Sequence, residues 1–233
     1  MSTDQPLSIG ITCYPTVGGS GAVAAELGKQ LARRGHSVHF VSYRLPFRLD
    51  DFNENIRYHE VDLTTYSLFE YPPHDLALAA KMAEIGITAT VQDHPVLLGH
   101  NQRRWWGDEH AAYGIPIRKA IDAGVLVGGG TDGPVVPVDP YLSMWWMTTR
   151  QVLKGYALGK EHAITPQEAL TLYTINNARV MGVEHERGSI EIGKLADLAV
   201  LSQDILAVPP DAIRDTRALL TVVGGKVVYR NGL

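Results

Sequence analysis

Hydrophobic and polar positions alternate along the first part of the chain in the order expected for a βαβ unit. Residues 7–13 (LSIGITC) and 36–42 (HSVHFVS) are short apolar runs typical of strands. Residues 22–34 carry apolar side chains at a helical spacing, and Gly35 marks the end of the predicted helix. The pattern therefore predicts two strands joined by a helix.

Three further segments predict the remaining strands of a sheet. Residues 56–62 alternate, residues 87–92 are rich in β-branched side chains, and residues 125–130 are apolar and end in glycine. Helices are expected between most of these strands. We therefore predict an α/β fold with a doubly wound parallel sheet of five strands in the order 3-2-1-4-5, in which the strand at 87–92 lies beside the first strand.

The rest of the chain predicts a loop, helices and two late strands. Residues 97–116 predict a long loop, and residues 117–123 predict a helix. Residues 165–168 (TPQE) match a capping box with proline at the first helical position, so another helix begins there. Residues 197–201 and 222–229 follow glycine-containing turns and predict strands.

A candidate catalytic residue follows the strand at 125–130, which ends in a predicted tight turn. Open α/β sheets and barrels both place their chemistry at the carboxyl ends of strands, so Asp132 is a candidate catalytic carboxylate. An Asp that only caps the turn is the alternative. His94 follows the strand at 87–92, and the predicted sheet would bring it to the same edge as Asp132.

A glycine-rich loop precedes the first predicted helix and consists of Gly18, Gly19, Ser20 and Gly21. Its N–H groups and the positive end of the helix could bind a phosphate or carboxylate, and a tight turn that binds nothing is the alternative. The loop does not match the dinucleotide-binding glycine pattern, and no acidic residue follows the second strand to bind a ribose. NAD binding is therefore disfavoured.

The segment from about Ser8 to Glu84 resembles the amino-terminal part of the N-acetyl-α-D-glucosaminyl L-malate synthase family. The matching stretches are GITCYPTVGGSGAVAAELGKQLARRGHSVHFVS, LPFRL and HEVDLTTYSLFEYPPHDLALAAKMAE. This family belongs to the retaining GT-B glycosyltransferases. The resemblance implies a Rossmann-like fragment in which Gly18 to Gly21 lie beside a UDP-sugar, and it ends at about Glu84.

The segment from about Ile85 to Tyr229 resembles the carboxyl-terminal part of family-3 metal-dependent amidohydrolases. The matching stretches are AGVLVGGGTDGPVVPVDPYLSMWWMTTR, ITPQEALTLYTINNARVMG, and RGSIEIGKLADLAVLSQDILAVPP with LLTVVGGKVVYRNG. The resemblance implies the last strands of a (β/α)₈ barrel, carboxyl-terminal helices and a partial β-sandwich. It also implies hydrolysis of C–N bonds, with Asp132 binding a metal and moving the proton of the attacking water.

The resemblance places the family's other metal ligands upstream of the matching segment, so we do not expect full family activity. A substitute site formed by Asp132 and His94 remains as a way to bind zinc or a similar divalent metal. Four histidines nearer the amino terminus have no metal-ligand spacing. We interpret them as ordinary strand or surface residues: His36, His39, His59 and His74.

The two resemblances meet near Glu84, which predicts a glycosyltransferase fragment at 1–84 and an amidohydrolase fragment at 85–233. The tetrapeptide IGIT occurs at 9–12 and again at 85–88. A short identity at the point where one resemblance ends is a trace that recombination or assembly could leave. The sequence therefore indicates an apparent chimera.

Composition and charge narrow the range of partners. The hydrophobic content of 45% is enough for a core, and the net charge of −4, from 21 basic and 25 acidic residues, gives no basic stripe for a nucleic acid. Without a membrane span or a signal-like start, we expect a cytoplasmic protein that acts on a small molecule. The single cysteine, Cys13, excludes an internal disulfide and a multi-cysteine zinc site.

Three functions follow from these observations. The first is amidohydrolase-like hydrolysis of a C–N bond, which the longer segment and Asp132 favour. The second is a glycosyltransferase fragment that binds a nucleotide-sugar, which the closer local match favours. The third is a chimera without catalysis, because neither segment brings all the partners that its chemistry needs. Bound zinc or manganese would favour the first, and a rise in melting temperature with a UDP-sugar would favour the second.

Overall fold

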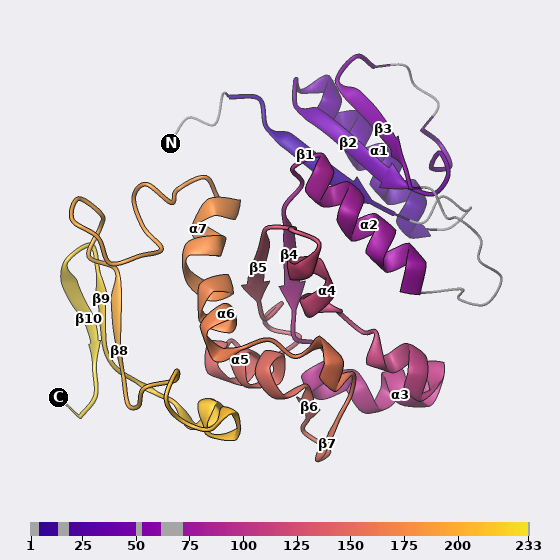
Figure 1. Ribbon diagram of the computed structural model, residues 1–233. Helices are drawn as coiled ribbons and strands as arrows, with labels where there is room; N and C mark the ends of the chain where they lie inside the picture. The colour runs from indigo at the N-terminus through magenta and orange to yellow at the C-terminus, as the bar shows by residue number, and fades with distance from the viewer. Residues whose placement is uncertain (1–4, 14–18, 50–52, 62–71, 233) are drawn as a thin grey trace. The chain divides into compact units, whose positions relative to one another are not determined.

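The computed structural model describes residues 5–13, 19–49, 53–61 and 72–232. The chain divides into two compact units (Figure 1). The first unit comprises residues 1–88 and 123–125, and the second comprises residues 89–122 and 126–233. The boundary expected at Glu84 lies close to this division, but it stays a prediction because a compact unit does not reveal the origin of its residues.

The first unit is a small parallel sheet with two helices. Its strands pair in the order β1-β2-β3, as predicted for this part of the sheet. A buried core lies on one face and includes Val38 and Phe40. The Phe40 ring packs where a Cβ on Gly28 would lie, so the helix and sheet can approach closely only with glycine there. The elements are β1 (Ser8–Thr12), α1 (Gly19–Arg33), β2 (Ser37–Ser42), β3 (Ile56–Glu60) and α2 (Pro72–Glu84).

The second unit begins with a parallel pair of strands followed by helices. β4 (Ala89–Gln92) pairs with β5 (Val127–Gly130), so that both strands end at the same edge. Other elements of this unit are the helices α3 (Pro95–Ala112), α4 (Ile117–Asp122), α5 (Pro140–Thr149), α6 (Pro166–Thr171) and α7 (Asn177–Val180), a π-helical turn (Leu172–Asn176), two 3₁₀ turns (Lys160–His162 and Pro210–Asp215), the short strands β6 (Gln151–Val152) and β7 (Tyr156–Ala157), and the strands β8 (Leu198–Leu201), β9 (Ala218–Val223) and β10 (Lys226–Arg230).

The predicted single sheet of five strands is not confirmed. The described strands β1 to β3 form one sheet, and β4 and β5 form another. The fourth strand is predicted to begin at Ile87. The Ile87 side chain instead packs over Gly10, and its backbone is not part of a strand. Strand pairing starts only at Ala89, where the backbone N–H donates to the Leu126 carbonyl at 2.9 Å.

The π-helical turn and α7 pack closely against β5. Asn176 Nδ2 donates to the Val127 carbonyl, and Asn177 Nδ2 donates to the Gly129 carbonyl, each at 2.9 Å. A Cβ on Gly129 would lie 2.7 Å from the ring of Tyr173. The glycines of β5 therefore let a helical segment approach the strand more closely than larger residues would permit.

We expect Gly129→Ala to lower the free energy of unfolding by about 1–3 kcal/mol, because the new methyl group would overlap the Tyr173 ring. Gly130→Ala is the matched control. Its Cβ would meet nothing closer than the Val91 carbonyl at 3.8 Å, so we expect a change within about 0.5 kcal/mol. Chemical denaturation of the two variants measures the difference, and equal stabilities would contradict the close approach of Tyr173.

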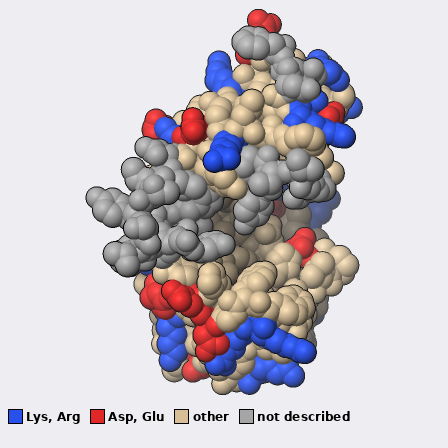
Figure 2. Space-filling view, turned by 90° about the vertical axis from the view of Figure 1, so that its right-hand side faces the viewer, with Lys and Arg blue, Asp and Glu red and all other residues tan. Residues whose placement is uncertain are grey.

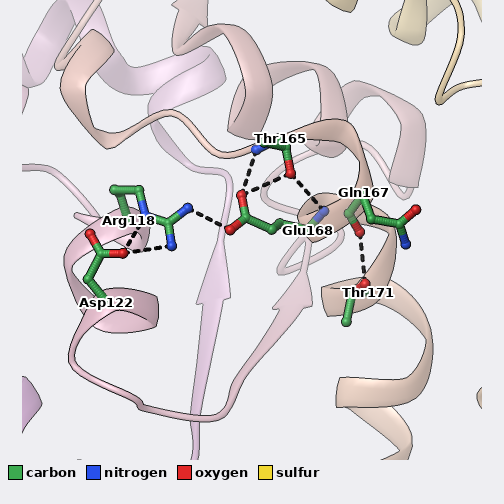
Figure 3. Close-up of polar contacts among 6 residues, drawn as sticks. All are labelled: Arg118, Asp122, Thr165, Gln167, Glu168 and Thr171. Atoms are coloured by element: carbon green, nitrogen blue, oxygen red, sulfur yellow. Dashed lines mark hydrogen bonds and ion pairs between the residues drawn. The ribbon is translucent and has the colours of Figure 1, made fainter.

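The predicted capping box begins α6. The Thr165 hydroxyl accepts from the Glu168 N–H, and Glu168 Oε2 accepts from the Thr165 N–H at 2.8 Å (Figure 3). The other carboxylate oxygen, Oε1, accepts from Arg118 of α4 at 2.6 Å. Arg118 also contacts Asp122 in its own helix, so the box is tied to a second helix by an ion pair.

The predicted loop at 97–116 is wrong, because most of it lies in α3. Gly107 interrupts this helix with a φ of 77°, a conformation that glycine adopts without strain. Trp105 and Trp106 are 67% and 52% exposed, so neither belongs to a core. The helix has no long apolar stripe, which explains why its sequence pattern resembles that of a loop.

A buried arginine ties several loops of the second unit together. Arg150, at the end of α5, is 1% exposed and lies over the Trp146 ring at 4.3 Å. Its guanidinium donates to the carbonyl oxygens of Gly114, Ile115 and Leu158 at 2.7, 3.0 and 3.2 Å. Burial lowers the pKa of Arg150 to about 10, so the side chain is still protonated at neutral pH.

The carboxyl-terminal strands form an antiparallel sheet in the order β10-β9-β8 (Figure 1). Every residue of β10 is exposed, and Val200, Val223 and Val228 are each more than 40% exposed. The described residues of this carboxyl-terminal segment contain this one sheet, and the partial β-sandwich expected for the segment is not confirmed. The apolar side chains of β10 and most of those of β8 face solvent, whereas most of β9 is partly buried.

The surface carries both signs of charge. On the face drawn in Figure 2, Lys and Arg side chains are interspersed with Asp and Glu. Within the described ranges, no helix combines the length and the apolar character needed to cross a membrane.

Candidate functional site

The two candidate residues at the strand ends lie together in the second unit. His94 follows β4, and Asp132 follows β5. Because β4 and β5 are parallel and in register from Ala89 with Val127 to Gln92 with Gly130, both residues leave the pair at the same edge. His94 Nε2 lies 2.7 Å from Asp132 Oδ2, which is a hydrogen bond or an ion pair according to the protonation of the ring.

The Asp132–His94 pair is accessible from solvent. The Asp132 side chain is 50% exposed and the His94 side chain is 29% exposed. Asp132 has a φ of 54°, in the left-handed region, and its carbonyl accepts from the Val135 N–H at 2.9 Å in a tight turn. Left-handed backbone is uncommon for residues other than glycine and is most frequent for Asn and Asp. The turn thus holds a carboxylate at the surface in a fixed position.

A buried acid that the sequence did not single out lies next to His94. Asp93 is 0% exposed, and its Oδ2 accepts from the Ser143 hydroxyl of α5 at 2.5 Å. Its Oδ1 has no hydrogen-bond partner among the described residues. Burial raises the pKa of Asp93, and the bond from Ser143 opposes that rise. The strand end therefore carries one buried carboxyl group and one exposed carboxylate.

The Tyr173 hydroxyl is a second buried polar group near β5. Burial raises its pKa to about 12, and a contact with the Ser143 hydroxyl opposes that rise. Tyr173 is therefore neutral at physiological pH. Tyr173 lies in the π-helical turn, far from Asp93 in the sequence. No local sequence pattern therefore indicates that its hydroxyl is buried near β5.

The His94 nitrogen and the Asp132 oxygen are of the kind that bind a divalent metal, but two such atoms are too few for a complete site. An imidazole nitrogen and a carboxylate oxygen are typical zinc ligands, and a catalytic zinc site has three protein ligands. Among the described residues, no group of three or more His, Cys, Asp or Glu side chains is placed to hold a metal ion. His94 and Asp132 together provide two donor atoms, so their role as metal ligands stays a prediction.

The glycine-rich loop is only partly described. Gly18 lies outside the described residues, and Gly19, Ser20 and Gly21 form the first turn of α1. Gly21 is buried. The anion-binding role of this segment stays a prediction.

A sequence model of the amidohydrolase family matches residues 62–229. The match begins upstream of Glu84, so it overlaps the end of the segment expected to be glycosyltransferase-like. N-substituted formamide deformylase of Arthrobacter pascens is 35% identical over 153 residues, which are 64% of this chain and 28% of that protein. The similarity agrees with the resemblance inferred for residues 85–229.

A different enzyme resembles the other end of the chain. N-acetyl-α-D-glucosaminyl L-malate synthase of Bacillus anthracis is 65% identical over 79 residues, which are 34% of this chain and 21% of that protein. The chain thus spans between a fifth and a third of the length of these two relatives. Together with the family match, this similarity supports the description of the chain as a chimera of two enzyme segments.

The fold also has counterparts among solved structures. A zinc-bound adenosine deaminase from Xanthomonas campestris superposes with a TM-score of 0.53 and 18% identity, over 97% of this chain and 52% of that one. At this identity the likeness concerns the fold alone.

Proposed function

Because the chain belongs to the amidohydrolase family, we propose that it hydrolyses a C–N bond of a small molecule at the carboxyl ends of β4 and β5. The observation that carries this proposal is the 2.7 Å contact between His94 Nε2 and Asp132 Oδ2. Parallel α/β folds bind substrates at this end of their strands. The pair combines a group that can take up a proton with a group that fixes its orientation.

We assign the proton transfer to Asp132. Water attacks the carbonyl carbon, and the carboxylate accepts the proton that the water releases. The C–N bond then breaks while Asp132 returns the proton to the leaving nitrogen, so that a carboxylic acid and an amine are formed. His94 donates to Asp132 Oδ2 and keeps the other carboxylate oxygen free for the substrate side.

Zinc or a similar divalent metal is the cofactor that the family suggests. His94 Nε2 and Asp132 Oδ2 would be two of its ligands, in place of the hydrogen bond that they make with each other, and a bound metal would lower the pKa of a water molecule. The proton transfers assigned to Asp132 do not depend on the identity of that metal. The zinc-bound relative in fold supports testing zinc first.

The proposal is tested by assaying the purified chain with a series of N-substituted formamides, with and without added zinc, and measuring amine release. The deformylase relative motivates this choice of substrates. We expect turnover above the uncatalysed rate. Absence of turnover for every amide, in a sample that melts cooperatively, would refute the proposal and leave the chimera without catalysis.

A second candidate, nucleotide-sugar binding, is supported by the similarity to the malate synthase over 79 residues. The same assay samples can be melted with a UDP-sugar. A rise in melting temperature without amide turnover would favour this second candidate, because a ligand that binds only the folded state stabilises it.

A further inference from the structure

Two histidines of the first unit form a pair on the sheet. His39 lies on β2 and His59 lies on β3, and His39 Nδ1 is 2.8 Å from His59 Nε2. The rings are nearly parallel, with an interplanar angle of 4° and centroids 5.0 Å apart. The residues are 20 positions apart in sequence, and only the parallel register of β2 and β3 brings them together. Direct contact between two ring nitrogens distinguishes this pair from isolated strand histidines.

We infer that His39 Nδ1 and His59 Nε2 form a chelating site for a late transition-metal dication such as Zn²⁺ or Ni²⁺. Imidazole nitrogen is the ligand that these ions share. The two nitrogens already lie in direct contact at 2.8 Å, and a bound metal ion would take the place of the proton between them. Water molecules would complete the coordination sphere.

The distance between the two nitrogens is close to that of a chelate. With Zn–N bonds of about 2.0–2.1 Å and a tetrahedral angle, two nitrogens on one ion lie about 3.3 Å apart. The observed 2.8 Å must therefore increase by about 0.5 Å. Both side chains are only partly buried, so small ring rotations can provide this change.

Ser37 supplies the support that a metal-bound histidine needs. A metal on His39 Nδ1 requires the ring proton to lie on Nε2, and Ser37 Oγ is 3.2 Å from Nε2 and can accept it. Metal-bound histidines almost always donate the second ring N–H to a hydrogen-bond acceptor, and here a hydroxyl oxygen takes that place. The same hydroxyl accepts from Arg57 at 2.9 Å, which fixes its position.

The surrounding charges set the strength of the site. Burial is the largest of the causes that lower the pKa of both histidines, and Arg57 contributes to each. The lowered pKa values favour the neutral rings that metal binding needs. Arg57 and Lys81 are positive and weaken cation binding, whereas the Glu84 carboxylate, which is 2.8 Å from Lys81, offsets part of that charge.

The test is a titration of the full chain with ZnCl₂ and NiCl₂, followed by calorimetry and by ring signals in NMR spectra. We expect His39→Asn and His59→Asn each to weaken binding at least about tenfold, because even loss of a partner that only supports a ligand costs 10- to 100-fold. Ser37→Ala should weaken it less. Arg57→Gln should strengthen it by removing a positive charge.

Two controls separate this site from the others. His185→Asn removes a histidine that is 69% exposed and should leave binding unchanged. His94→Asn removes one member of the proposed hydrolytic pair and should leave the Ni²⁺-induced broadening of the His39 and His59 signals in place. Absence of that broadening in the wild-type chain, or metal binding that depends only on His94, would overturn the inference, whereas the proposed hydrolysis is tested separately by amine release.

Discussion

Arg150→Ala is expected to lower the free energy of unfolding by about 3–5 kcal/mol, the range for breaking a buried, charged hydrogen-bond network. The substitution leaves the carbonyl oxygens of Gly114, Ile115 and Leu158 without their donor. It also removes the group that lies over the Trp146 ring. Chemical denaturation followed by tryptophan fluorescence measures the loss.

Two further variants show whether the stability depends on the geometry of the Arg150 guanidinium or on its charge. Arg150→Lys keeps the charge but cannot donate to three carbonyl groups from one planar fork, so we expect it to recover only part of the stability. Arg103→Ala removes an exposed arginine bound to Asp108 and should change stability by less than about 1 kcal/mol. A similar loss for Arg103→Ala and Arg150→Ala would argue against the buried network.

Asp132→Asn is expected to reduce amide hydrolysis by about 10²- to 10⁴-fold, the usual contribution of a general acid–base group. The amide keeps the shape of the side chain but cannot accept the proton of the attacking water. Asn also tolerates the left-handed backbone at this position, so the fold should be preserved. Steady-state rates of amine release, together with the melting temperature, measure both effects.

The matched control is Asp108→Asn, which alters a carboxylate that is 69% exposed and distant in sequence from the proposed site. Its hydrolysis rate should equal that of the wild type. The hydrolysis rate of His94→Asn should lie between those of Asp132→Asn and Asp108→Asn, because the substitution removes the partner of Asp132 but not the proton acceptor. Full activity in Asp132→Asn would reject the assigned role while leaving the family membership untouched.

The sequence predicted those helices and strands that depend mainly on a short stretch of neighbouring residues. The strands of the first unit follow from short runs with apolar or alternating side chains, the helix between the first two ends before Gly35, and α6 begins at a capping box that the sequence displays in full. The meeting of His94 and Asp132 was also predicted, because parallel neighbouring strands end at one edge. In each case a short stretch of residues carries enough information.

Features that depend on distant residues could not be predicted. The division into two sheets depends on the strand with which β4 pairs. The side chains of β4 alternate in the same way whether the partner is β1 or β5, so the sequence pattern does not identify the partner. Asp93 and Ser143 are 50 positions apart, so only the fold reveals their hydrogen bond. The same reason explains why His39 and His59 were interpreted as unrelated residues.

The asparagine side chains beside β5 have a consequence for self-association. The carbonyl groups of Val127 and Gly129 would otherwise be free acceptors that a foreign strand could use. Because Asn176 and Asn177 already occupy them, another chain cannot extend the pair of strands at these two positions. A helix thus performs the protective task that charged or proline-rich edges perform in many sheet proteins.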